Sequence, residues 1–83
     1  MNTINIKILF FGLLKTYFGS QITLPIQRGT TLRELLFQLK EKIPEVTEVL
    51  ELCQLAVNST LVDEDFLLFE PDEVAILPPF SGG

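Results

Sequence analysis

The chain has 83 residues, 47% of them hydrophobic and 20% charged, which suits one small domain built around a single hydrophobic core. Six Lys and Arg against eleven Asp and Glu give a net charge of −5, which disfavours nucleic-acid binding and favours a partner with a basic patch. The absence of His and the single Cys exclude imidazole base catalysis, cysteine-rich zinc sites, Fe–S clusters and an intrachain disulfide.

The first apolar segment, residues 8–14, has the hydrophobicity of a signal peptide, but Lys7 alone makes a poor basic leader and no small-residue cleavage site follows. It is also far shorter than the roughly 20 residues that span a bilayer, so we expect a cytoplasmic protein without membrane contact. Alternation instead predicts a strand over residues 4–11. Its core-facing side chains are Ile4, Ile6, Ile8 and Phe10, while Leu9 and Phe11 point to the opposite face.

Two short elements are predicted before the main helix. Residues 13–18 lie between two glycines and predict a single helical turn. Residues 21–26 predict a second strand, and Pro25 within it indicates an edge position because proline cannot donate a ladder hydrogen bond.

One clear helix is predicted from Thr31 to about Ile43. Thr31 and Glu34 have the spacing of a capping box, and Pro44 disfavours helical dihedral angles at Ile43. A further short helical turn is expected over residues 46–50. The apolar stripe of the main helix consists of Leu32, Leu35, Leu36, Leu39 and Ile43.

The second half of the chain predicts the remaining strands. Residues 53–57 and 60–62 flank the turn signal Asn58-Ser59, and the apolar run 66–69 should cover one end of the core. Residues 74–77 are apolar at every position, which indicates a central strand. This order of elements predicts an α+β, β-grasp domain over residues 1–77, with a mixed sheet packed on one main helix.

Residues 78–83 predict an extended tail in which the function would lie. The tail consists of Pro78, Pro79, Phe80, Ser81, Gly82 and Gly83. The two prolines lack amide donors and favour a polyproline path away from the sheet. The two glycines lack side chains, so the backbone there can enter a narrow channel. Fully extended, the tail reaches about 20 Å, which indicates a stiff stalk with a slender tip.

The sheet face opposite the main helix predicts a protein interface. The helix can cover only one face, so apolar side chains on the other face would remain exposed beside the tail. We expect a partner to bind there, through Phe11, Leu61, Leu77 and Phe80.

Two other features are expected to be structural. Cys53 at the start of a strand indicates a buried thiol rather than a reactive one. Asp63-Glu64-Asp65 lacks the spacing and the glycine of a calcium loop, which indicates a solvated turn.

Three segments of the sequence match the sequence pattern of a known protein family. They are Ile6-Lys7-Ile8-Leu9-Phe10-Phe11, then Ala56-Val57-Asn58, and finally Asp72-Glu73-Val74-Ala75 followed by Pro78-Pro79-Phe80-Ser81-Gly82-Gly83. Together they resemble the small subunit of molybdopterin synthase, a family of ubiquitin-like sulfur carriers with the β-grasp fold. The resemblance covers essentially the whole chain. It departs from the family pattern at Pro71, where Gly is frequent, and at Lys15-Thr16, where Arg-Glu is common.

The resemblance implies that the Gly83 carboxylate is the chemically active group. An adenylating enzyme similar to those that activate ubiquitin would adenylate it with ATP, and a sulfur donor protein would then displace AMP to leave a thiocarboxylate. The tail would enter the large subunit of molybdopterin synthase and donate its sulfur to the pterin precursor. The chain itself would bind no cofactor and would act as a sulfur-donating subunit without catalytic groups of its own.

Other functions use the same tail. A carrier for the thiolation of tRNA or thiazole would use identical terminal chemistry, and a protein modifier would be joined to lysines through Gly83. A plain binding module would leave the tail unactivated. The residues alone leave these alternatives open.

Overall fold

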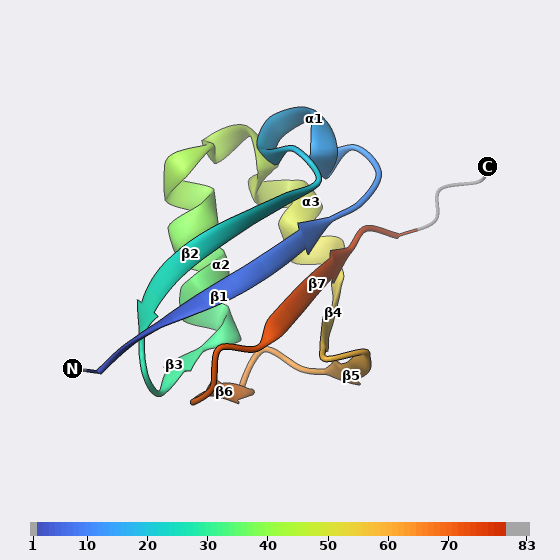
Figure 1. The fold of residues 1–83 in the computed structure, drawn as a ribbon. Coiled ribbons are helices and arrows are strands. Elements are labelled where there is room, and N and C mark those ends of the chain that lie inside the picture. The colour runs from blue at the N-terminus through green and yellow to red at the C-terminus, as the bar shows by residue number, and fades with distance from the viewer. Residues whose placement is uncertain (1, 80–83) are drawn as a thin grey trace.

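The computed structural model describes residues 2–79, in which a five-stranded mixed sheet has the order β2-β1-β7-β4-β5 and carries helices on one face (Figure 1). β1 and β7 are parallel neighbours, and the other neighbouring pairs are antiparallel. This is the α+β arrangement that the order of elements predicted. The strands of the sheet are β1 (Thr3–Phe10), β2 (Gln21–Gln27), β4 (Gln54–Val57), β5 (Thr60–Val62) and β7 (Glu73–Leu77).

Residues 2–79 contain four helical elements, of which three follow the positions expected from the sequence and η1 was not expected. They are α1 (Leu14–Phe18), α2 (Leu32–Lys42), the 3-10 turn η1 (Pro44–Val46) and α3 (Thr47–Leu52). α2 begins with the predicted capping box, in which the Glu34 amide donates to Thr31 Oγ1 at 3.2 Å and the Thr31 amide donates to Glu34 Oε1 at 3.0 Å. None of the helices in residues 2–79 is long and apolar enough to cross a membrane.

The hydrophobic core lies between α2 and the sheet. Every buried side chain in the described part of the chain is apolar, so packing holds the domain together. The alternation in β1 and the helical stripe of α2 both predicted their buried sides correctly. The fully buried residues include Ile6, Ile8, Leu14, Leu32, Leu35, Leu39, Leu68, Val74 and Ile76.

Two strands occupy the positions that their composition indicated. β2, which contains Pro25, is an edge strand of the sheet. β7 is the central strand, between β1 and β4, and its apolar run is buried or half-buried from Val74 to Leu77. Because β7 ends at Leu77, the chain leaves the sheet at the residue where the sequence placed the start of the tail.

A small second sheet was not expected from the sequence. β3 (Thr30–Thr31) pairs antiparallel with β6 (Leu67–Leu68). Within the apolar run 66–69, Leu68 is fully buried, whereas Leu67 and Phe69 are half exposed. The expectation that the whole run covers the core was therefore right for only part of it, because neighbouring side chains of a strand point to opposite sides.

Candidate functional site: the open sheet face and the root of the tail

Within residues 2–79 one face of the sheet carries no helix: α2 and α3 lie against the other face, and α1 lies at the end of the sheet toward which β1 runs (Figure 1). The strand register brings four apolar residues into one row across this open face. Leu9 on β1 is paired with Ala75 on β7, Ala75 with Ala56 on β4, and Ala56 with Leu61 on β5. The row spans four adjacent strands, and at its end the Leu61 side chain is 60% exposed.

A second pair of apolar residues lies at the end of the sheet from which the tail departs. Phe10 and Ile76 are partners in the parallel β1–β7 ladder, so Phe11 and Leu77 follow side by side at the ends of these strands. Phe11 is 43% exposed and Leu77 is half-buried. We define the docking face as Leu9, Phe11, Ala56, Leu61, Ala75 and Leu77.

The opposite end of the same face is polar. Lys7 and Glu73 are ladder partners, and Lys7 Nζ lies 3.9 Å from Glu73 Oε2. Beside them Asn58 Nδ2 donates to Asp72 Oδ1 at 2.9 Å, and the Glu73 amide donates to Asn58 Oδ1 at 3.1 Å. The open face is thus divided into a hydrogen-bonded polar end and a mainly apolar end, at which the exposed Gln54 is the ladder partner of Leu77, and the tail begins at the mainly apolar end.

The root of the tail contacts the turn after β1. Pro78 is half-buried and Pro79 is exposed. Gly12 in that turn has a φ of 58°, and a Cβ built on it would lie 3.5 Å from Cγ of Pro78. Gly12 and Pro78 are therefore close neighbours, and a side chain at position 12 would pack against the proline at which the chain leaves β7. The predicted site residues Phe80, Ser81, Gly82 and Gly83 lie outside the described residues.

Charge is distributed unevenly along the chain. None of the eleven acidic residues lies before Glu34. β1, α1 and β2 therefore contain no carboxylate side chain, whereas the acidic residues belong to the helices α2 and α3 and to the second half of the chain. The helices themselves are close to neutral, because α2 also carries Arg33, Lys40 and Lys42. The excess of acid lies in residues 63–73, which hold six of the eleven acidic residues and no Lys or Arg.

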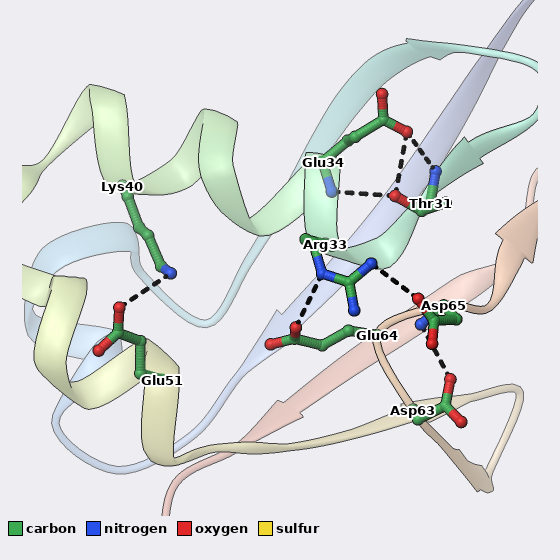
Figure 2. A network of polar contacts seen from close by, with 8 residues as sticks. All are labelled: Thr31, Arg33, Glu34, Lys40, Glu51, Asp63, Glu64 and Asp65. Carbon is green, nitrogen blue, oxygen red and sulfur yellow. Dashed lines mark hydrogen bonds and ion pairs between the residues drawn. The ribbon is translucent and has the colours of Figure 1, made fainter.

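A group of polar contacts joins α2 to its surroundings (Figure 2). Arg33 Nη1 lies 2.7 Å from Asp65 Oδ1, and Arg33 Nε lies 3.3 Å from Glu64 Oε1, so both acids raise the pKa of the guanidinium. The Asp65 amide donates to Asp63 Oδ1 at 2.8 Å. These exposed pairs hold the 63–65 loop against the start of α2, in agreement with the solvated turn that the sequence indicated. Within residues 2–79 no group of three or more His, Cys, Asp or Glu side chains is arranged to hold a metal ion.

The single cysteine is half-buried. Its Sγ donates to the carbonyl oxygen of Val49 at 3.1 Å, and burial raises the pKa of the Cys53 thiol to about 11. The thiol is therefore protonated at neutral pH and is a poor nucleophile. This agrees with a structural role for Cys53.

The sequence predicted part of this site and missed part of it. Phe11 and Leu77 lie where the tail begins, and Leu61 lies on the same face at the edge strand β5; their contact with a partner stays a prediction. Ala56 and Ala75, which complete the row, were not proposed as interface residues, and neither was Gly12. The parity of each strand could have assigned the two alanines to this face, but their alignment depends on register between distant strands.

A five-stranded β2-β1-β7-β4-β5 sheet with one main helix on a single face defines a β-grasp domain, the class to which ubiquitin-like proteins belong. Within that class the chain belongs to the ThiS family, whose model matches residues 8–83.

Several relatives match over nearly their full length. The molybdopterin synthase sulfur carrier subunit of Dictyostelium discoideum is 38% identical to this chain, with 93% of this chain and 94% of the relative covered. Subunit 1 in a complex of subunits 1 and 2 of the molybdopterin-converting factor from Helicobacter pylori is 30% identical, with a TM-score of 0.70 over 96% of this chain and 100% of that one. The small archaeal modifier protein 1 of Methanosarcina acetivorans, at 24% identity, supports the fold alone, with a TM-score of 0.77 over 100% of both chains.

Proposed function

We propose that this chain is the sulfur carrier subunit of molybdopterin synthase and acts in the biosynthesis of the molybdenum cofactor. Its support is the ThiS family match together with relatives of that name, among them one 38% identical over nearly its whole length. The observation that carries the proposal is structural: the apolar end of the open sheet face lies where the tail begins. A sulfur carrier needs an apolar docking surface next to its tail, since the same partner must bind the domain and receive the tail at the same time.

The proposed chemistry takes place on the carboxylate of Gly83. A carboxylate is a poor acyl donor because its oxygen is a poor leaving group. An adenylating enzyme therefore transfers AMP from ATP to this carboxylate and releases pyrophosphate. The terminal sulfur of a persulfide on a sulfur donor protein then attacks the acyl carbon and AMP departs. A thiol cleaves the resulting S–S bond, and a thiocarboxylate remains on Gly83.

The next step takes place in the large synthase subunit. The tail enters the subunit's pocket, and the thiocarboxylate sulfur bonds to a carbon of the pterin precursor as an oxygen leaving group departs from that carbon. Water then cleaves the acyl–sulfur bond, which leaves the sulfur on the precursor and restores the carboxylate of Gly83. In this scheme the folded domain supplies affinity and orientation. The docking face binds the partner, and Pro78, which lies next to Gly12, sets the direction in which the tail leaves. We place these steps in the cytoplasm, in accordance with the sequence expectation.

Intact-mass spectrometry tests the proposal. The full chain is incubated with the adenylating enzyme, ATP and a persulfide donor, and with ATP omitted as the control. A mass gain that equals the exchange of one oxygen for sulfur, present only with ATP, is the expected result. If the chain is instead joined to other proteins as a ladder of higher masses, it is a protein modifier. If its mass never changes with any cognate adenylating enzyme, the tail is not activated and the proposal is wrong.

A further inference from the structure

Within residues 2–79, six large exposed apolar side chains lie outside the docking face, and two of them are close to it. The six are Leu13, Tyr17, Phe37, Leu52, Leu67 and Phe69. Leu13 directly precedes α1 and Tyr17 lies within it, four residues later, so both project from the same side of this helical turn. Their exposed fractions are 56% and 41%. Leu13 and Tyr17 therefore form an exposed apolar strip, which we name the α1 strip.

The packing of α1 fixes this strip in place. Leu14 is fully buried, and the ring of Phe18 stacks on Phe10 with a centroid distance of 4.5 Å and an angle of 11°. The amide of Gly19 donates to the Lys15 carbonyl at 2.9 Å and closes the turn. A partner that covers Leu13 and Tyr17 would thus bind an element that is already ordered, which reduces the entropic cost of association.

The strip continues the docking face around the root of the tail. Phe11 belongs to the docking face, Gly12 contacts Pro78, and Leu13 comes next in the chain. Because β1 and β7 run parallel, α1 follows β1 at the same end of the sheet where the tail follows β7 (Figure 1). A protein that receives the tail is therefore brought next to α1.

The charges around the strip also favour burial. Lys15 is the one charged residue of α1, and no carboxylate side chain lies in residues 1–33. By contrast, Phe37 has Arg33 and Glu41 one turn away on α2. Dehydrating charged groups is costly, and the cores of interfaces are depleted of them. The α1 strip is therefore easier to cover with an apolar surface than the surroundings of Phe37.

We propose that Leu13 and Tyr17 form a second contact with the large synthase subunit, beside the entrance through which the tail passes. This inference rests on the proposed function and extends its docking face to α1. The partner surface that it requires is apolar and lies at the rim of the pocket that receives the tail.

A binding titration with the full chain and its large subunit tests the contact. The double variant Leu13→Ser/Tyr17→Ser should raise the dissociation constant by about tenfold or more, the range expected of residues at the centre of an interface. Phe37→Ser is the matched control, because this side chain is 59% exposed but lies on α2. Its dissociation constant should remain within about twofold of wild type. Thermal unfolding of each variant checks that the domain is intact.

A second readout requires no substitution. Tyr17 is the only tyrosine of the chain, so 3-fluorotyrosine incorporated into the carrier gives a single fluorine resonance that reports on this position. We expect this resonance to shift and to lose contact with solvent when the large subunit binds. An unchanged resonance in the complex, or a double variant that binds like wild type, would overturn the α1 contact alone. A wild-type chain that neither binds the large subunit nor acquires sulfur would overturn the proposed function and this contact with it.

Discussion

The exposed leucine on β5 provides a quantitative test of the docking face. Full burial of a leucine side chain is worth about 1.5–3 kcal/mol, so covering the 60% of Leu61 that is exposed would contribute about 1–2 kcal/mol to binding. Because alanine keeps part of this surface, we expect Leu61→Ala to weaken binding to the large subunit by about 1 kcal/mol, which corresponds to about fivefold in the dissociation constant.

Leu52→Ala is the matched control for this experiment. Leu52 is 68% exposed, similar to Leu61, but lies on α3 on the helical side of the sheet. Isothermal titration of each variant against the large subunit should show weaker binding for Leu61→Ala and wild-type affinity for Leu52→Ala. Thermal unfolding of the free variants monitors the fold. Equal affinities for both variants, or equal losses, would refute the assignment of the partner to the open face.

The remaining predictions concern the edge of the docking face, the α2 cap and the cysteine. Phe11→Asp should weaken the same complex more strongly than Leu61→Ala, because it places a charge in the apolar contact. The variant domain should remain folded. Unchanged affinity in the titration would contradict this prediction. Thr31→Ala should lower the free energy of unfolding by about 1 kcal/mol at neutral pH through loss of the cap. Hydrogen bonds from Thr31 lower the pKa of Glu34 below its ordinary 4.5. The ionised Glu34 carboxylate therefore stabilises the folded state at pH values above the pKa of Glu34 in the unfolded chain. This contribution is lost as the pH falls through the pKa of Glu34 in the folded protein. The difference between wild type and Thr31→Ala in urea denaturation should therefore shrink on acidification, and a constant difference would count against the capping box. The Cys53 thiol, with its pKa raised to about 11, should react slowly with iodoacetamide at neutral pH in the folded protein and much faster in urea. Equal reaction rates with and without urea would show that the thiol is accessible in the folded state.

Local patterns were sufficient to predict most of the fold. The alternation of Ile4, Ile6 and Ile8 indicated which face of β1 is buried, because the strand period of two leaves only one choice. The capping box at Thr31 marked the start of α2, since it depends on residues only three positions apart. In both cases the deciding contacts are close in sequence.

Contacts between distant segments could not be predicted in the same way. The β3–β6 pair joins residues 30–31 to 67–68, and nothing local to Thr30 indicates its partner. The row from Leu9 to Leu61 depends on the register of three ladders, and the contact of Gly12 with Pro78 depends on the parallel pairing of β1 and β7. The sequence therefore predicted individual residues of the open face, whereas the surface that they form together required the structure.

Sulfur transfer from a chain extended by one residue tests the central claim most directly. Two versions are treated with the adenylating enzyme, ATP and a persulfide donor, then mixed with the large subunit and the pterin precursor; one has the natural sequence and the other carries a single alanine after Gly83. We predict that the natural chain delivers sulfur to the precursor, and that the extended chain delivers none although it unfolds at the same temperature. Equal sulfur delivery by the extended chain would contradict the claim that the Gly83 carboxylate is the working group.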